Sequence, residues 1–406
     1  MSEFQASNFK KENGGTPDLL GKTELTSPYF FVPPSGTTAE RPENCAAGTL
    51  RFNTDIGTLE VYRGDVIGWE QIQRRESQYL GGGTGSNLGT GTRGIILGGE
   101  GDGISNTNII EYITIESLGN TQDFGDLVYA RRGGTQNCGS RVRALAAGGY
   151  TGPTDTDGID FILFSSTGNA MDFGDLTSNT HSGSACSTDI RGIFTGGYTG
   201  SGTVTNNICY VTIASTQNAV DFGDLSRQSR ALGSCQSTTR GIQAGGAPSN
   251  QNTMDFITMA TTGNATDYGD LTVGRDIVTG GGNSIRGIFA GGRTAPAGAR
   301  TNVIDFITIA TLGNATDFGD LPDAAYMPAK SSACSSLRMV MTMPDAGPYT
   351  AGFDFVDIAT LGNVQDFGDA STSMGSNGAN SNGHGGLYWQ YLDQIQFQEL
   401  EQRAQY

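Results

Sequence analysis

The stretch that decides the fold runs from residue 286 to residue 321 and reads RGIFAGGRTAPAGARTNVIDFITIATLGNATDFGDL. It begins with a short apolar run that two glycines close, and a variable turn follows. Residues 302–311 are rich in β-branched and aromatic side chains and nearly apolar on both faces, which is typical of a strand buried between two layers. After an LGN turn, the DFGD string supplies another short strand. The stretch therefore predicts short strands separated by turns.

This unit is repeated six times along the chain. The string DFGD, once DYGD, begins at Asp123, Asp172, Asp221, Asp267, Asp317 and Asp366. A second marker, RGI with two following glycines or a degenerate form of it, begins at Arg93, Arg143, Arg191, Arg240, Arg286 and Arg338. Both markers recur every 46 to 52 residues. Two independent markers with one period indicate a true repeat array.

Each period holds about four short strands, and no segment of residues 80–370 carries a convincing helical apolar stripe. The sequence therefore predicts an all-β fold, a β-propeller whose layout and glycine pairs resemble the Kelch type. Small residues (Ser, Ala, Gly and Cys) in the polar part of each period suit narrow inner strands, and the paired glycines suit sharp turns. The usual Kelch tryptophan is absent from all six copies. The rival interpretation is a solenoid or a string of sandwiches.

The number of blades is six or seven. Residues 371–389 look like the first strands of a seventh copy, and residues 59–72 have the shape of two closing strands, with Trp69 in the Kelch-like place. The two ends could together form a seventh blade. In the alternative that we favour, six blades close alone and residues 46–72 form a separate β module. The predicted parts are an extended arm (1–45), a small β module or part of a closing blade (46–77), the propeller (78–386) and a C-terminal helix (387–406).

The two ends of the chain carry further signals. Residues 27–42, SPYFFVPPSGTTAERP, favour an extended arm because of their proline pair and their Ser/Gly/Thr cluster. The aromatic residues Tyr29, Phe30 and Phe31 need a partner surface to bury them, so we interpret the arm as a docking segment. At the other end, an apolar seam that begins at Leu387 predicts a helix that packs on the propeller or associates with copies of itself.

Composition excludes several classes of function. The chain has 41 acidic and 24 basic residues and a net charge of −17, which argues against nucleic acid or an anionic membrane as the main partner. No apolar run approaches the about 20 residues that cross a bilayer. The N-terminus lacks the apolar region of a signal peptide. Six cysteines make no disulfide framework, and no CxxC pair suggests zinc. We expect no metal, no cofactor and no membrane insertion.

The repeated aspartates are the most tempting catalytic feature. Paired carboxylates can hydrolyse glycosides, but a catalytic site occurs once per chain or per interface, whereas this pair occurs six times. We interpret the aspartates as structural, with side chains that bond backbone N–H groups in a turn. We therefore expect no catalytic residue and no enzyme.

Other chemical candidates are weaker. Asp155, Asp157 and Asp160 have partial calcium-loop spacing without the bidentate glutamate. The two histidines, His181 and His384, stand alone. Four cysteines share one slot in different copies and are predicted to be small buried residues beside the propeller axis: Cys138, Cys186, Cys235 and Cys334. The NAT strings at Asn264 and Asn314 fit the glycosylation pattern but are simply the repeat's turn.

Binding is better placed on the turns that follow the glycine pairs, because they differ in length and sequence among the copies. A rigid scaffold with variable loops on one face is the usual arrangement for recognition. Tyr150 and Tyr198 directly follow their glycine pairs and are candidates for stacking on sugar rings. The alternative is that they only cover the edge of a blade.

Residues 48–72, GTLRFNTDIGTLEVYRGDVIGWEQI, together with the run that precedes them, resemble the N-terminal module of tailed-phage virion proteins. They are especially similar to tail-fibre and other structural proteins of phages that infect cyanobacteria and marine bacteria. The strings RGIFAGG and IDFITIATLGNATDFGDL resemble the repeats of the same group, and the two matches cover most of residues 27–370.

The resemblance implies a virion structural protein that is assembled in the host cytoplasm. Its expected role is a fibre-like appendage that adheres non-covalently to a glycan or receptor of the host surface. The arm with Tyr29, Phe30 and Phe31 would attach it to other virion proteins, and the protein would be a homo-oligomer, by resemblance a trimer. The alternative is a purely architectural protein for decoration, neck or baseplate attachment.

Overall fold

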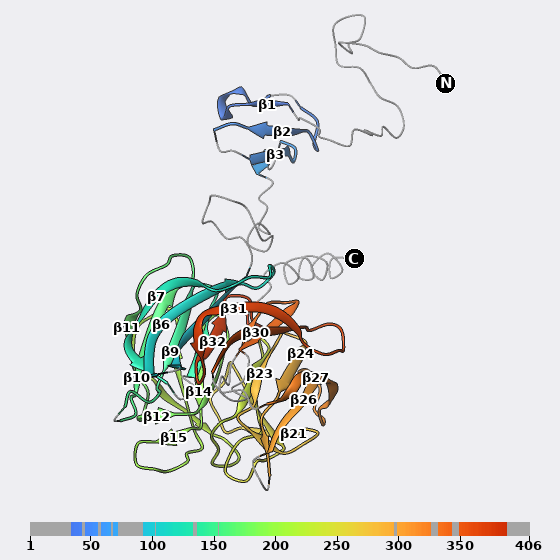
Figure 1. Cartoon of the computed structure of the whole chain (residues 1–406). Helices are drawn as coiled ribbons and strands as arrows, with labels where there is room; N and C mark the ends of the chain where they lie inside the picture. The colour runs from blue at the N-terminus through green and yellow to red at the C-terminus, as the bar shows by residue number, and fades with distance from the viewer. Residues whose placement is uncertain are drawn as a thin grey trace, which may run out of the picture. The chain divides into compact units, whose positions relative to one another are not determined.

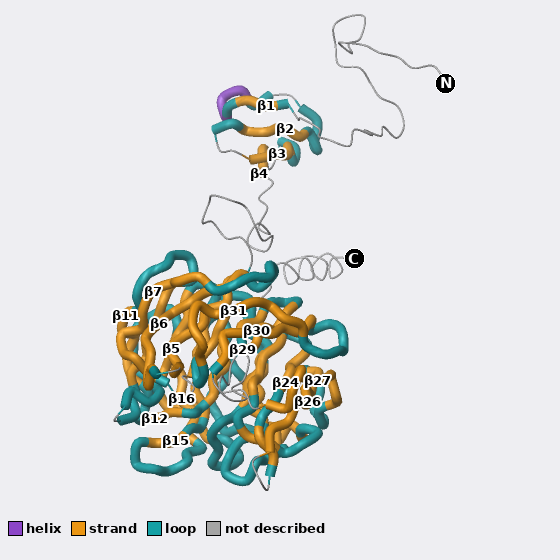
Figure 2. Tube along the Cα trace, in the orientation of Figure 1, coloured by secondary structure: helices purple, strands orange, loops and turns teal. Residues whose placement is uncertain are grey.

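The computed structural model describes residues 34–42, 45–55, 58–65, 68–71, 92–101, 103–132, 136–152, 154–295, 299–325, 332–342 and 349–387. The chain divides into two compact units between Arg75 and Glu76. Strands joined by loops make up nearly all of the regular structure, and the only helical element in the described ranges is the 3-10 turn Thr38–Glu40 (Figure 2). The chain is therefore an all-β protein. The predicted docking aromatics Tyr29, Phe30 and Phe31, and the predicted helix beyond Leu387, lie outside the described residues.

The first unit is one sheet in the order β1-β2-β3-β4. Its strands are β1 (Ser35–Gly36), β2 (Leu50–Asn53), β3 (Thr58–Tyr62) and β4 (Trp69–Gln71). β1 pairs with β2 in parallel, and the other pairs are antiparallel. The N–H of Phe52 donates to the carbonyl of Pro34 at 2.8 Å, and the N–H of Thr54 donates to that of Gly36 at 2.9 Å. The sheet thus begins inside the segment 1–45 that the sequence predicts as an extended arm, because Pro34 and Gly36 accept hydrogen bonds from the edge of β2.

The described residues of the second unit form six antiparallel sheets that share one four-strand pattern, which we number in chain order. Sheet 1 contains β32 (Gly378–Ser381), β5 (Arg93–Gly101), β6 (Ile104–Thr114) and β7 (Gln122–Arg131). Sheet 2 contains β8 (Gln136–Gly139), β9 (Arg143–Ala147), β10 (Gly158–Leu163) and β11 (Met171–Asp175). Sheet 3 contains β13 (Ser184–Ser187), β14 (Arg191–Thr195), β16 (Asn207–Thr212) and β17 (Val220–Asp224).

The remaining sheets repeat this pattern. Sheet 4 contains β18 (Gly233–Gln236), β19 (Arg240–Ala244), β20 (Thr253–Thr258) and β21 (Thr266–Asp270). Sheet 5 contains β23 (Thr279–Gly282), β24 (Arg286–Ala290), β26 (Ala299–Thr308) and β27 (Thr316–Ala325), and it is extended by β22 (Arg275–Asp276) and β25 (Arg293–Thr294). Sheet 6 contains β28 (Ala333–Cys334), β29 (Arg338–Thr342), β30 (Thr350–Asp357) and β31 (Gln365–Met374).

The C-terminal strand β32 completes sheet 1, whose own repeat supplies only three strands. Gly378 pairs with Leu97 and Ser381 with Gly94, so the end of the repeat region lies beside its beginning (Figure 1). Trp69 and its neighbours belong instead to the separate sheet of the first unit. In the described residues, the strands of the segment 59–72 and the C-terminal strand β32 therefore lie in different sheets. The expected extra first strand exists, but it belongs to the first copy and not to a seventh.

Hydrophobic clusters lie between consecutive sheets. Each of six clusters combines buried side chains of two neighbours, and one of them joins sheet 6 to sheet 1 through residues such as Val340, Phe355, Ile96 and Ile113. The first strands of consecutive sheets also contact one another, and β32 contacts both β28 and β8. Each sheet thus buries apolar surface against two neighbours, and the order of contacts is cyclic.

The arginine of the RGI marker joins each sheet to the next. In sheet 2, the Arg143 guanidinium lies 4.7 Å from the ring centre of Phe161, and it donates to the carbonyl of Ile213 in the turn of sheet 3 at 2.9 Å. The same contacts recur at the other five markers, and Arg338 of sheet 6 donates to Ile115 of sheet 1 at 3.3 Å. The marker is therefore a connection between sheets.

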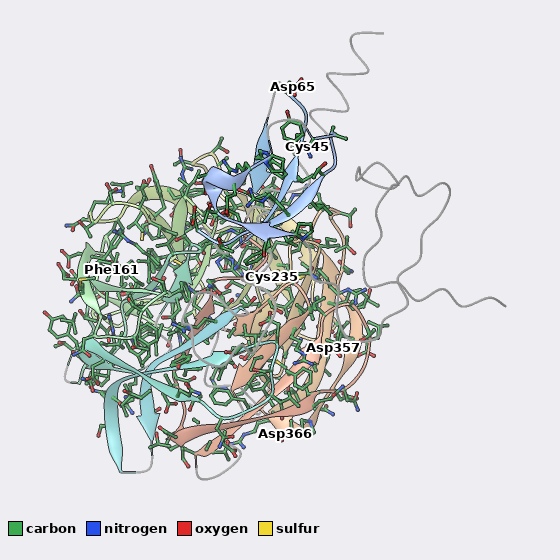
Figure 3. The ribbon with its side chains drawn as sticks, turned by 90° about the horizontal axis from the view of Figure 1, so that it is seen from above. Cys45, Asp65, Phe161, Cys235, Asp357 and Asp366 are labelled. Carbon is green, nitrogen blue, oxygen red and sulfur yellow. The ribbon has the colours of Figure 1, made fainter. Side chains whose placement is uncertain are left out.

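Small residues fill the first strands, as the sequence predicted. All four residues of β13, SACS, are buried. The thiol of Cys186 in this strand faces Gly241 in the second strand of the next sheet. A Cβ added to Gly241 would lie only 2.5 Å from the Cys186 sulfur. Cys138 faces Gly192 in the same way, at 2.8 Å. The glycine of the RGI marker is thus required by the close approach of neighbouring sheets. Cys235 lies toward the middle of its unit and Asp366 toward the edge (Figure 3).

Candidate ligand-binding site

The variable turns meet the connectors between sheets at one end of the second unit. In a four-stranded antiparallel sheet, the turn between the second and third strands lies at the same end as the connector that leaves the fourth strand. Between sheets 2 and 3 these segments pair as β12 (Thr180–His181) and β15 (Tyr198–Thr199), with His181 opposite Tyr198. The same pairing recurs at Gly375 with Glu100, Arg132 with Tyr150, Arg230 with Ala247 and Asp276 with Arg293. We call these five pairs the pairing positions.

The paired glycines create this geometry. Gly148 and Gly149, just before Tyr150, have φ angles of 64° and 110°, which L side chains rarely adopt. They turn the chain sharply out of β9, and the N–H of Tyr150 then donates to the carbonyl of Arg132 at 2.8 Å. A constant backbone frame thus carries a different pair of side chains in each described copy. This is the arrangement expected of a recognition surface.

Residues of three of the pairing positions line a pocket of about 720 Å³. Its lining residues are Glu100, Arg132, Tyr150, Thr154, Asp155, Asn179, His181, Ser182, Tyr198, Thr199, Gly200 and Gly202. They come from the variable turns of sheets 1, 2 and 3 and from the connectors between these sheets. Both tyrosines that the sequence singled out therefore lie in one pocket.

The aromatic rings of the pocket form a continuous series. The ring of His181 lies between the two tyrosines, with its centre 6.4 Å from that of Tyr150 and 5.3 Å from that of Tyr198. The guanidinium of Arg132 lies 5.3 Å from the Tyr150 ring, and that of Arg230 lies 5.3 Å from the Tyr198 ring. Edge contacts and cation–π contacts of this kind hold the rings in place.

The charged groups of the pocket are compensated by one another. Arg132 forms an ion pair with Glu100, whose other carboxylate oxygen accepts a hydrogen bond from Ser376 at 2.7 Å. Nδ1 of His181 lies 3.0 Å from a carboxylate oxygen of Asp155, which is 6% exposed. The result is a polar pocket with partly exposed tyrosine rings and little uncompensated charge.

His181 lines the pocket although the sequence predicts it only as an isolated histidine. The pairing of β12 with β15 brings it opposite Tyr198, 17 residues later in the chain. A signal for it exists in the repeat period, because Arg132, His181 and Arg230 follow one another at intervals of 49 residues. Each therefore occupies the same connector position in successive copies.

The three aspartates with calcium-loop spacing do not gather. Asp155 contacts His181 in the pocket, whereas Asp160 lies in β10 and forms a buried ion pair with Arg131. Burial raises the pKa of Asp160, and the nearby Arg131 acts against this shift. No group of acidic, histidine or cysteine side chains in the described ranges could hold a metal ion. Nor does any helix in this part of the chain have the length and apolar character of a membrane span.

The DFGD strings lie at the junctions between sheets. At the first one, the carbonyl of Phe124 accepts the N–H of Gly168 at 2.7 Å, and the N–H of Asp126 donates to the Asn169 side chain at 3.1 Å. An added Cβ at Gly125 would lie 2.5 Å from the carbonyl oxygen of Gly168. The same asparagine contact recurs at the other five copies, including Asn264 and Asn314 of the NAT strings. The backbone of the motif, and not the aspartate side chain that we expected, makes these bonds.

The cysteines of the first strands are buried, as the sequence predicted. Burial raises the pKa of Cys186 to about 12 and raises those of Cys138, Cys235 and Cys334 as well. A thiol with a raised pKa in an apolar site reacts slowly, because the thiolate is the nucleophile. Cys45 of the first unit is partly exposed.

A thiol titration tests this contrast. With an aromatic disulfide reagent at neutral pH, we expect one fast thiol in the native protein and six after denaturation, because only Cys45 is accessible. Replacement of Cys45 by serine should remove the fast phase. Rapid reaction of several thiols in the native Cys45→Ser variant would contradict the burial of the first strands.

His384 does not line the pocket, and its imidazole ring contacts the first strands. Its Nε2 is 2.8 Å from the carbonyl oxygen of Gly139 and 3.2 Å from the hydroxyl of Ser187, and the Gln236 amide is 3.0 Å from its Nδ1. These partners belong to β8, β13 and β18, so the segment after β32 crosses the ends of three first strands. Burial lowers the pKa of His384 to about 4.

Comparison of the chain with models of protein families finds no match, and comparison with curated protein sequences finds none either.

Proposed function

We propose that the second unit is a six-bladed β-propeller of Kelch-like layout. Six four-strand patterns share hydrophobic clusters with their neighbours in cyclic order, and this supports the proposal. The arginine contacts that run from sheet 6 to sheet 1, and the contacts among the first strands, support it further. A propeller is the arrangement in which small sheets bury both faces by radial stacking.

The protein that carries this propeller is, in our proposal, a structural protein of a phage virion. It acts as a fibre-like appendage that adheres to the host cell surface by holding a glycan in the aromatic pocket. Tyr29, Phe30 and Phe31 of the arm attach it to other virion proteins. The resemblance of residues 27–72 and of the repeats to tailed-phage virion proteins supports this setting, and the pocket is the observation that carries the adhesive role.

The chemistry of the pocket suits a sugar. The face of a tyrosine ring packs against the C–H groups of a pyranose, and ligand sites generally combine such apolar surfaces with a few polar groups that fix orientation. Tyr150 and Tyr198 supply the rings, and Thr154, Asn179 and Thr199 add hydrogen-bonding groups that line the same space. Adhesion of this kind makes and breaks no covalent bond, so the proposal assigns no catalytic residue.

Binding to isolated polysaccharides tests the adhesive role. The full chain is titrated against a panel of surface polysaccharides from cyanobacteria and marine bacteria, and the binding variant is Tyr150→Ala/Tyr198→Ala. We expect saturable binding to at least one polysaccharide and about a tenfold or greater loss in the variant, because aromatic anchors at the centre of a site carry most of the binding energy.

Tyr129→Ala is the matched control, because Tyr129 is 54% exposed and does not line the pocket. It should bind as the wild type does. Equal losses in the control and in the double variant, or binding that the double variant leaves unchanged, would contradict the assignment of the pocket.

The architectural role is the second candidate, and one surface feature favours it. The turns between first and second strands, at the end opposite the pocket, carry aliphatic side chains that are at least 60% exposed: Val142, Ile190, Ile285 and Leu337. Apolar groups gathered at one end are typical of a surface that meets a partner in an assembly. A folded chain that binds no polysaccharide of the panel but does bind virion proteins through these turns would establish this role instead.

A further inference from the structure

Basic side chains accompany the aromatic rings of the pocket in three successive copies. Arg132, His181 and Arg230 are spaced 49 residues apart and occupy corresponding pairing positions. The Arg132 guanidinium lies 5.3 Å from the centre of the Tyr150 ring, and the Arg230 guanidinium lies 5.3 Å from that of the Tyr198 ring. Since the His181 ring lies between the two tyrosines, the arginines contact the two terminal rings of the series.

The two arginines differ in how their charge is balanced. Arg132 forms an ion pair with Glu100, and in the next charged pairing position Arg293 forms one with Asp276 at 2.8 Å. The Arg230 guanidinium forms no ion pair with the described residues, and its side chain is partly exposed. Arg230 therefore adds an unbalanced positive charge at the edge of the pocket.

The backbone holds Arg230 beside the ring of the preceding copy. Its N–H donates to the carbonyl of Ala247 at 3.0 Å, and the N–H of Ala247 donates to the carbonyl of Arg230 at 2.9 Å. Where Arg132 has Tyr150 as its partner, Arg230 thus has only a methyl group. The aromatic contact of Arg230 is instead Tyr198, which lines the pocket.

A guanidinium in this position suits an anionic group of a bound sugar. Its N–H donors have a fixed fork geometry that matches the oxygens of a carboxylate or another oxyanion, and an arginine that stacks on an aromatic ring can still use this fork. A sugar in contact with the Tyr198 ring has its substituents beside Arg230. An anionic substituent would balance the charge that the described residues leave unbalanced.

We propose that the glycan held in the pocket is acidic and that Arg230 binds its carboxylate or sulfate group. This inference rests on the proposed glycan-binding function and names the class of sugar. The net charge of −17 argues against a partner held mainly by charge. Here Tyr150 and Tyr198 supply the apolar contact, and one guanidinium selects the acidic sugar. Arg230 is thus the specificity-determining residue of the site.

Removal of the charge from the polysaccharide tests the proposal. The polysaccharide that binds the full chain most tightly is compared with two modified forms, one with its carboxylates reduced to hydroxymethyl groups and one with its sulfate esters removed. We expect at least one modification to weaken binding about tenfold or more, because hydrogen bonds to charged groups are the stronger ones. That modification identifies the anionic group. Unchanged binding of both modified forms would overturn the proposal.

The variant Arg230→Gln tests the residue. It should lose about tenfold in affinity for the native polysaccharide and should bind the neutralised form as the wild type does. Arg230→Lys keeps the charge and should still prefer the native form. The matched control is Arg141→Gln, which removes one arginine from the turn between β8 and β9, at the end opposite the pocket. It should bind as the wild type does.

The outcomes separate this proposal from the glycan site itself. Equal losses of Arg230→Gln for the native and neutralised forms would mean that Arg230 only supports the Tyr198 ring, which would overturn the proposal. If Arg230→Gln binds as the wild type does while Tyr150→Ala/Tyr198→Ala loses binding, the glycan site stands and the role of Arg230 is overturned. If the double tyrosine variant also binds as the wild type does, both the site and the role of Arg230 are overturned.

Discussion

Replacement of Asp305 by asparagine is expected to lower the free energy of unfolding by about 3–5 kcal/mol. Asp305 lies in β26, and its carboxylate is 2.9 Å from Nη2 of Arg275, which belongs to the connector from sheet 4. Both side chains are completely buried. The substitution therefore leaves a buried guanidinium without its counter-charge, which is the costly way of breaking a buried ion pair.

Arg275 cannot easily move away after the substitution. Its guanidinium also donates to the carbonyls of Val303 at 2.9 Å and Phe289 at 3.1 Å, so backbone contacts hold it at the junction of two sheets. Burial lowers the pKa of Arg275, and the charge of Asp305 acts against this shift, so loss of the carboxylate would disfavour the buried charge further.

Urea denaturation followed by circular dichroism measures the effect. The matched control is Asp357→Asn, because Asp357 forms an exposed pair with Arg338 at 3.5 Å. Exposed pairs contribute about 0–1 kcal/mol, so this variant should unfold close to the wild type. If Asp305→Asn also unfolds within about 1 kcal/mol of the wild type, the buried pair does not have the role that its geometry assigns.

The second large effect is a loss of stability on acidification that depends on His384. The ordinary pKa of histidine is 6.5, and burial lowers that of His384 to about 4. Between these pH values the histidine binds a proton in the unfolded chain but not in the folded chain. The free energy of unfolding therefore falls as the pH falls. The expected loss is about 1.4 kcal/mol per pH unit, or about 3 kcal/mol from pH 6.5 to pH 4.

The contacts of His384 explain why its imidazole ring stays neutral in the folded protein. The carbonyl of Gly139 can only accept, so Nε2 donates to it at 2.8 Å. Nδ1 then accepts the N–H of Gly386 at 3.2 Å, as well as the Gln236 amide at 3.0 Å. A second proton on Nδ1 would face these donors.

The test compares the wild type with His384→Gln, because other groups also titrate in this range. Burial and the nearby Asp366 raise the pKa of Asp354 to about 6, which acts in the opposite direction and stabilises the protein as the pH falls. This contribution is common to both proteins and cancels in their difference. We expect the stability advantage of the wild type to shrink by about 3 kcal/mol between pH 6.5 and pH 4. An advantage that stays constant over this range would contradict the account.

The sequence predicts the all-β class, the buried first strands and the sharp glycine turns because these follow from local patterns. The RGIFAGG string carries an apolar strand and its turn within seven residues, and Cys186 stands among small residues that fit close packing. Which sheet receives β32 could not be predicted, because the first copy lacks a first strand of its own and sequence periodicity does not reveal the edge that accepts one. Pairing between Ser381 and Gly94 spans almost the whole repeat region.

The candidate site was predictable only in part. Tyr150 and Tyr198 follow glycine pairs on variable turns, so position alone made them candidates. They line the same pocket only because the connector that contains β12 pairs with the turn that contains β15. This pairing places the His181 ring between the two tyrosine rings. The buried partners Arg275 and Asp305 are likewise 30 residues apart and meet only because the connector strand β22 joins sheet 5. Contacts between copies of the repeat are not encoded within one copy.

A crystal structure of the full chain with an oligosaccharide from the polysaccharide that binds most tightly tests the central claim most directly. The account predicts a sugar ring within about 4 Å of the Tyr150 or Tyr198 ring, which is ordinary van der Waals contact. Polar groups of the same sugar should meet the side chains of Asn179 or Thr199. A sugar bound elsewhere on the chain, with the pocket left to solvent, would contradict it.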